Sequence, residues 1–252
     1  MNQHLKRENC NLLAEADHRI ANHFAMLAGH VRLKTTVLAR QTTEPSRDEM
    51  LLILQSIGVH IDAVASLHRI LANDGLRAFT DLDHHLRNIC DAFRSGPAYD
   101  FVLIENFESG CALPLNQLLP VTQIFAEAIT NAVKHGHSSG KAGTIRASCG
   151  KDAGGTIVVE VIDEGRGLPQ GFDCNTQKGF GFRLVEALSK QIGGLVDYQS
   201  SDRGLRFRLT LPLSLTPDLA KPASPTTLRQ RLSMFRARRN GDAERKEAAS
   251  SH

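Results

Sequence analysis

Apolar residues recur at helical spacing along the first 76 residues, a stretch whose only proline is Pro45. Two series step by three, four or seven positions, which keeps each series on one side of a helix. The first series is Leu13, Ile20, Phe24, Leu27, Val31 and Leu38, and the second is Met50, Leu54, Ile57, Ile61, Val64, His68 and Leu71. The segment 42–47 between them has the composition of a turn. This spacing predicts two long helices joined as a hairpin.

The apolar stripes of this hairpin are wider than one partner helix can cover. They are flanked by further apolar residues, namely Leu12, Ala16, Leu51, Ile53 and Leu67. A single hairpin would leave this surface in water, which folded proteins rarely do over a large area. We therefore predict that two copies pair as a homodimer with a four-helix bundle.

Length and composition exclude several classes of protein. The chain has 252 residues, of which 41% are hydrophobic and 23% charged, as in folded globular proteins. No apolar run approaches the roughly 18 residues of a membrane span, and the first residues lack a signal-peptide core. The five cysteines are scattered, so we expect reduced thiols. A cytoplasmic protein with no membrane span is predicted.

Positive charge is concentrated near the C-terminus. Residues 215–252 hold eight Lys or Arg and four Asp or Glu, an excess larger than the net charge of +3 of the whole chain. The rest of the chain is therefore slightly acidic. This balance argues against a nucleic-acid partner, because neutralising phosphates needs a basic surface. We expect 214–252 to form a basic, flexible tail.

Helical and β-rich segments alternate between residues 77 and 213. Helices are expected at 81–93, 118–136 and 182–192, with Pro120 in the first turn of the second. Strands are expected at 99–107, 144–148, 156–162, 195–199 and 205–211. Antiparallel strands with helices on one face predict an α/β sandwich. The whole chain is then α + α/β, with a hairpin domain at 1–76, a sandwich domain at 77–213 and the tail at 214–252.

One face of the expected helix 118–136 gathers polar side chains. Gln123, Glu127, Asn131 and Lys134 are spaced by four, four and three positions. Such a face can hold Mg²⁺ and phosphate oxygens. Asn131 offers a carbonyl oxygen to the metal, Lys134 a positive charge to phosphate, and Glu127 a base or a carboxylate that positions water.

Two glycine-rich turns follow this helix. Asp163 ends the strand 156–162 and precedes Gly165 and Gly167, which let a ligand approach the backbone. Asp163 can accept a hydrogen bond from an adenine amino group. Gly179 and Gly181 open the helix 182–192, where free N–H groups can receive phosphate.

The order of these motifs resembles a known family. The stretches "EAITNAVKHG", "VIDEGRGLP" and "GFGFRLVEALSKQIGG" resemble the N, G1 and G2 boxes of the GHKL-type ATP-binding domain, shared by sensor histidine kinases, gyrase-type ATPases and Hsp90 chaperones. The resemblance implies an α/β sandwich that holds Mg-ATP under a mobile lid, here 169–178. It assigns nucleotide binding to Asn131, Lys134, Asp163 and the glycines Gly165, Gly167, Gly179 and Gly181, with Mg²⁺ on Asn131.

The hairpin resembles one branch of the histidine kinases. "EADHRIANHF" resembles the phosphoacceptor box H-R-x-x-N, and "IDAVASLHRIL" resembles the second helix of that branch. The branch is close to the HWE kinases, but the chain has no tryptophan, so the sister branch with the same box fits better. Asp17 occupies a stripe position, so we expect His18 to project off the bundle.

This resemblance implies a histidine kinase of a two-component system. The γ-phosphoryl group of ATP would pass to His18 and then to an aspartate of a response-regulator receiver domain. Glu127 would accept the proton, and Asp17 would orient the ring. No sensor module is expected before His18, so a separate sensor protein is a further expected partner.

Two alternative functions stay open. A non-catalytic phosphotransfer adaptor would have the same hairpin and a vestigial ATP-binding domain. An anti-sigma-type switch kinase would use the same ATP fold to phosphorylate a protein serine.

Overall fold

The structure is a computed structural model that describes residues 2–73, 79–96, 100–136, 143–168 and 180–211. Within these ranges, the side chains of residues 2–19, 33 and 180 are not described. The chain divides into two compact units, Met1–Thr216 and Pro217–His252. The second unit lies outside the described residues, as does the tail expected at 214–252. The division into three domains stays a prediction.

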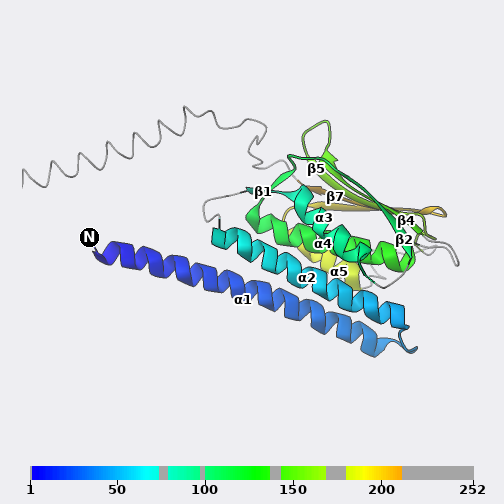
Figure 1. Cartoon of the computed structure of the whole chain (residues 1–252), viewed down its shortest axis with the longest axis horizontal. Helices are drawn as coiled ribbons and strands as arrows, with labels where there is room; N and C mark the ends of the chain where they lie inside the picture. The colour runs from blue at the N-terminus through cyan, green and yellow to red at the C-terminus, as the bar shows by residue number, and fades with distance from the viewer. Residues whose placement is uncertain (1, 74–78, 97–99, 137–142, 169–179, 212–252) are drawn as a thin grey trace, which may run out of the picture. The chain divides into compact units, whose positions relative to one another are not determined.

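The two helices expected in the hairpin are present. Helix α1 spans Asn2–Arg40 and α2 spans Arg47–Asn73, and they lie side by side in Figure 1. The backbone N–H of Glu49 donates to Ser46 Oγ at 3.1 Å, which caps the start of α2. The four-helix bundle needs a second chain and stays a prediction.

Helix α2 is apolar enough to resemble a membrane span. Residues Arg47–Leu71 have the length and a mean hydropathy, 1.7, that would suit one. In the structure Leu52, Val59 and Leu67 of this helix are instead buried in the protein core, which includes α4 (Leu115–His135). Other apolar residues of the helix, among them Leu54 and Ile61, are exposed. The absence of a membrane span stays a prediction.

The sandwich contains a mixed five-stranded sheet. Its order is β2 (Phe101–Phe107), β4 (Gly143–Lys151), β5 (Ile157–Asp163), β7 (Gly204–Leu211) and β6 (Leu195–Ser201). Three of the four pairings are antiparallel, as expected. The β2–β4 pairing is parallel, which corrects the expectation of antiparallel strands alone. A parallel neighbour requires a crossover, and the chain between β2 and β4 includes α4.

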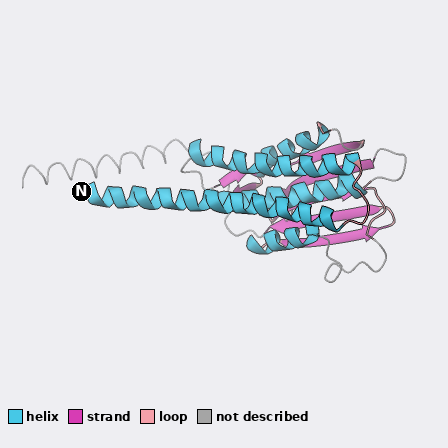
Figure 2. Ribbon diagram, turned by 90° about the horizontal axis from the view of Figure 1, so that it is seen from below, coloured by secondary structure: helices cyan, strands magenta, loops and turns pink. Residues whose placement is uncertain are grey.

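Three helices cover one face of this sheet. They are α3 (Leu82–Arg94), α4 and α5 (Phe180–Gln191), and Figure 2 shows them on the same side of the strands. Helix α4 begins at Leu115, three residues before the expected start, so Pro120 lies inside the helix and not in its first turn. A small two-stranded sheet of β1 (Phe79–Asp81) and β3 (Ala112–Pro114) was not expected. It brings the N-terminus of α3 close to that of α4.

Helix α4 is the centre of the core. Nearly every side chain between Leu118 and Val133 is buried, because the helix packs on the sheet, on α3, on α5 and on α2. Polar residues on such a helix have to find partners inside the protein. This applies to Gln123 and Glu127, which were expected on a polar face and are buried.

Two histidines are buried between the helices of the hairpin. The rings of His30 in α1 and His60 in α2 stack with centroids 4.0 Å apart. His60 Nδ1 donates to the backbone oxygen of Ser56 at 2.6 Å, whereas both ring nitrogens of His30 lack a hydrogen-bond partner among the described residues. Burial, helped by the nearby His60 and Lys34, lowers the pKa of His30 to about 3. Burial also lowers the pKa of His60.

These pKa values predict a fold that weakens in mild acid. The folded state excludes a proton that the unfolded chain binds below pH 6.5, so the free energy of unfolding should fall as the pH drops from 6.5 toward 3. The slope for one such site is at most about 1.4 kcal/mol per pH unit. Urea unfolding at pH 7.5 and 5.5 should show a smaller loss for His30→Leu than for the wild type. His84→Gln, on the exposed side of α3, should leave the loss unchanged.

Candidate functional site

A cavity of about 510 Å³ opens between α4, α5 and the strands β5, β6 and β7. Its polar wall includes Asn131 of α4 and Asp163 at the end of β5. Gly167 and Leu168, which follow β5, complete this side. Three of the residues predicted to bind nucleotide, Asn131, Asp163 and Gly167, thus meet around one cavity large enough for a small ligand.

Asp163 is held rigidly at the cavity wall. Its Oδ1 accepts from the backbone N–H of Gly165 at 2.9 Å and of Leu205 at 3.3 Å. The residue is 7% exposed, and burial raises its pKa although the two backbone donors act in the opposite direction. Both of these donors use Oδ1. A carboxylate oriented in this way can recognise the amino group of a purine.

The glycines near Asp163 allow close backbone packing. A side chain at Gly165 would overlap the backbone at His135 and Gly136, at the end of α4. Gly167 has φ = 65°, a conformation that favours glycine, and an added Cβ would overlap the backbone at Ser201. Gly165 thus holds the turn against α4, and Gly167 brings it to the cavity. Gly179 lies outside the described residues.

An aromatic wall faces the polar one. The rings of Phe182 and Tyr198 have centroids 4.8 Å apart, and Tyr198 and Phe207 have centroids 5.4 Å apart. Aromatic surfaces of this kind suit a planar base. None of these three rings was assigned to the site in the sequence analysis. The alternation of β6 could have identified Tyr198, because residues at alternate positions of that strand face the helices.

The other two predicted charges of α4 point toward the hairpin. Glu127 accepts from Lys34 Nζ, which lies 3.1 Å from both carboxylate oxygens. Lys134 Nζ lies 2.5 Å from Oε1 of Glu49 at the start of α2. Gly181 provides room for Glu127, since an added Cβ there would overlap its carboxylate. Neither Glu127 nor Lys134 lines the cavity.

The cavity fits a magnesium ion only together with a nucleotide. No group of three or more His, Cys, Asp or Glu among the described residues is arranged to hold a metal. Asn131 supplies one amide oxygen at the cavity wall, a ligand type that Mg²⁺ accepts. Phosphate oxygens and water would have to supply the rest, as is usual for Mg²⁺ in sites that bind nucleotides.

The predicted phosphoacceptor box belongs to α1. His18 and Asp17 are residues of α1, and their side chains are outside the described part of the chain. The expected lid, 169–178, also lies outside them. His68, which belongs to the apolar series of α2 and was predicted to be a core or capping histidine, is half-buried. Its Nε2 lies 3.2 Å from Nδ1 of His23.

Comparison with known proteins agrees with this geometry. Residues 116–215 match the family model of the histidine kinase-, DNA gyrase B-, and HSP90-like ATPases. The match covers α4, the two glycine-rich turns, α5 and four strands of the five-stranded sheet. The predicted resemblance to histidine kinases with a GHKL-type ATP-binding domain is confirmed for this part of the chain.

Particular relatives match a larger share of the chain. Blue-light-activated histidine kinase 2 of Erythrobacter litoralis (strain HTCC2594) is 22% identical over 206 residues, which are 80% of this chain and 57% of that protein. The histidine kinase domain of the E. litoralis EL346 blue-light-activated histidine kinase has a similar fold, with a TM-score of 0.60 and 22% identity over 80% of this chain and 91% of that chain. A second EL346 structure gives a TM-score of 0.58, at 21% identity, over 81% of this chain and 59% of that chain. This chain thus spans little more than half the length of the curated relative.

The position of Asp163 predicts a role in ATP binding. Asp163→Asn keeps the shape of the residue but removes its charge, so ATP affinity should fall by about tenfold to a hundredfold. Titration with a fluorescent ATP analogue measures the change. Asp197→Asn, on the exposed side of β6, is the matched control. Equal affinity of Asp163→Asn and the wild type would exclude Asp163 from the binding site.

Proposed function

We propose that the chain is an ATP-dependent protein-histidine kinase of a two-component system. It transfers the γ-phosphoryl group of ATP to His18, and from His18 to an aspartate of a response-regulator receiver domain. The observation that carries this proposal is the meeting of Asn131, Asp163 and Gly167 around one cavity. The same chain bears an H-R-x-x-N box on its first helix.

The residues have separate tasks in the proposed reaction. Asp163 and the aromatic wall hold the base of ATP, and Asn131 holds Mg²⁺ together with phosphate oxygens. The ion neutralises phosphate charge, which is the main need of phosphoryl transfer. Lys134 and the backbone N–H groups at Gly181 are the protein groups that bind the phosphates.

His18 acts as the nucleophile in its neutral form. One ring nitrogen forms a bond to the γ-phosphorus as the bond to the leaving ADP oxygen breaks. The other nitrogen then gives up its proton, for which Glu127 is the proposed acceptor, while Asp17 orients the ring.

The proposed kinase works as a cytoplasmic homodimer. Large apolar side chains of the hairpin are exposed in the single chain, among them Phe24 at 60%, Leu54 at 59% and Ile61 at 51%. A second hairpin would cover them and complete a four-helix bundle. The other proposed partners are the receiver domain and a separate sensor protein, with no role for nucleic acid.

A non-catalytic phosphotransfer adaptor is the competing function. It would keep the hairpin but would not bind ATP. The cavity favours the kinase, because the described residues leave about 510 Å³ open between a polar wall with Asn131 and Asp163 and an aromatic wall. A titration that detects no Mg-dependent ATP affinity at millimolar ligand would select the adaptor.

Replacement of the acceptor should abolish labelling. His18→Gln should incorporate no phosphate from γ-³²P-ATP, whereas His68→Gln, on the second helix, should still be labelled. The wild-type label should be acid-labile and stable in base. Equal labelling of His18→Gln and the wild type would show that His18 is not the acceptor, and acid-stable phosphate would favour a serine kinase.

A further inference from the structure

Two buried cysteines from different parts of the chain meet near the end of β2. Cys111 lies between β2 and β3, and Cys149 lies in β4, opposite Phe107 at the end of β2. Both are free thiols, with 0% and 1% of their surface exposed. The two thiols are hydrogen-bonded to each other. A pair of thiols in contact inside the protein is the arrangement from which a disulfide can form.

The backbone holds each cysteine in this position. The backbone N–H of Gly110 donates to Asp81 Oδ2 at 2.8 Å. The backbone N–H of Leu82 donates to the backbone oxygen of Cys111 at 3.0 Å. Cys149 is fixed by its place in β4, which pairs with a strand on either side. Each cysteine is thus held by its own segment, and the two thiols face each other in the folded protein.

We propose that Cys111 and Cys149 form a redox-active pair that hydrogen peroxide converts to a disulfide. The inference concerns the folded domain itself and goes beyond the proposed kinase function. In the proposed cytoplasmic setting the pair rests as two thiols, and disulfides that form there are usually transient and redox-sensing. The bond would join the segment before α4 to the sheet. A thiol reductant would reverse it by thiol–disulfide exchange.

The two thiols differ in reactivity. The hydrogen bond from Cys149 lowers the pKa of Cys111, and the nearby Lys151 acts in the same direction although burial opposes both. The same hydrogen bond, together with burial, raises the pKa of Cys149. The thiolate is the form of cysteine that attacks peroxide. Cys111 is therefore the nucleophile that reacts first, and Cys149 is the resolving thiol.

The proposed reaction balances with one molecule of hydrogen peroxide. The Cys111 thiolate attacks one peroxide oxygen and the O–O bond breaks. The leaving hydroxide takes up the proton that Cys111 had released and becomes water. The sulfur of Cys149 then attacks the sulfenic acid on Cys111, and the S–S bond forms as the hydroxyl group leaves with the Cys149 proton as a second water. The two thiols lose two electrons, which reduce the peroxide to water.

Peroxide can reach Cys111 through the turn that precedes it. Glu108 and Ser109 are exposed, and Gly110 has φ = 85°, a backbone conformation that favours glycine. A Cβ added at Gly110 would meet no atom of the described residues within 4 Å, so the turn is loosely packed at this point. Such turns open at a lower free-energy cost than the core. Cys111 is the first buried residue behind the turn, so opening exposes the thiol that reacts first.

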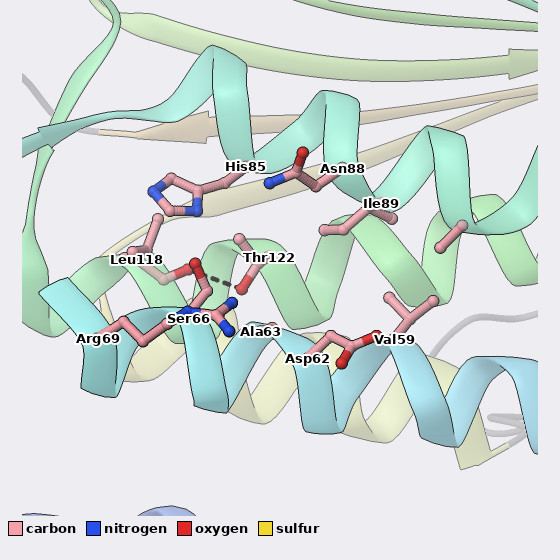
Figure 3. Close-up of a pocket in the computed structure, with 11 residues that line it drawn as sticks. Val59, Asp62, Ala63, Ser66, Arg69, His85, Asn88, Ile89, Leu118 and Thr122 are labelled. Carbon is pink, nitrogen blue, oxygen red and sulfur yellow. Dashed lines mark hydrogen bonds between the residues drawn. The ribbon is translucent and has the colours of Figure 1, made fainter.

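Cys90 of α3 is a buried thiol that lacks this arrangement. It follows Ile89, which borders a cavity of about 230 Å³ between α2, α3 and α4 (Figure 3). A small oxidant can therefore come near Cys90. Burial raises the pKa of Cys90, and the other groups that act on this pKa are charged side chains, not thiols. Cys90 is thus a matched control, a buried cysteine without a paired thiol in the described part of the chain.

The test uses the full chain with Cys10→Ser and Cys174→Ser, whose side chains lie outside the described residues. Hydrogen peroxide is added to the folded protein, the remaining thiols are blocked in denaturant, and the peptides are mapped by mass spectrometry without reduction. A peptide pair that joins Cys111 to Cys149 should accumulate about tenfold faster or more than any oxidised form of Cys90. Dithiothreitol should regenerate both thiols.

Two variants test the order of attack. Cys149→Ala should leave a sulfenic acid on Cys111 that dimedone captures, because no thiol remains to resolve it. Cys111→Ala should give no capture at Cys149. Cys90→Ala should still form the disulfide. In the chain that keeps both cysteines, oxidation should raise the unfolding temperature by about 5 °C or more, because the bond closes a loop that contains α4.

The outcomes decide the inference without any measurement of kinase activity. Recovery of Cys111 and Cys149 as thiols after peroxide, or oxidation of Cys90 at the same rate, would overturn it. A lower unfolding temperature of the oxidised chain would show that the bond does not fit the folded structure, which also overturns it. Capture by dimedone at Cys149 in Cys111→Ala would contradict the assigned order. Because the mapping keeps both native cysteines, its result stands even where a variant fails to fold.

Discussion

Glu127 carries a negative charge into the interior of the protein, and the packing of three helices depends on how that charge is paired. Its side chain is 3% exposed on α4, the helix that the sheet and the hairpin enclose. A buried carboxylate is tolerated only beside a cation or strong donors. Lys34 supplies the cation, so α1 has to pass close to α4. Gly181 of α5 supplies the space, because any side chain there would overlap the carboxylate.

Much of the fold follows from patterns that are local in the sequence. The apolar spacing of α1, α2 and α5 locates these helices because one side of each must be covered. The alternation of β7 correctly assigns Phe207 and Leu209 to the interior and Arg206 to the surface. The turn 151–155 contains Gly155 with φ = 80°, and it joins β4 to β5 as a hairpin. In each case the residues that decide the structure are neighbours in the chain.

The remaining features depend on contacts between distant residues. Alternating apolar residues look the same in a parallel and an antiparallel strand, so the sequence could not show that β2 pairs with β4 in parallel. A polar face on α4 suggests exposure to water, and only the fold shows that Lys34, 93 positions away, makes it an interior face. Asn131, Asp163 and Gly167 could be predicted to share a site because they belong to motifs that follow one another in a recognisable order. Their aromatic partner Tyr198 belongs to no such motif.

The position of Lys134 links the hairpin to the nucleotide. Its ammonium group can face Glu49 or a phosphate, and the two negative partners compete for it. Linkage requires this effect to be mutual. If the pair with Glu49 weakens ATP binding by some factor, bound ATP weakens the pair by the same factor. The size of this coupling is set by the difference in pairing energy of Lys134 with its two partners.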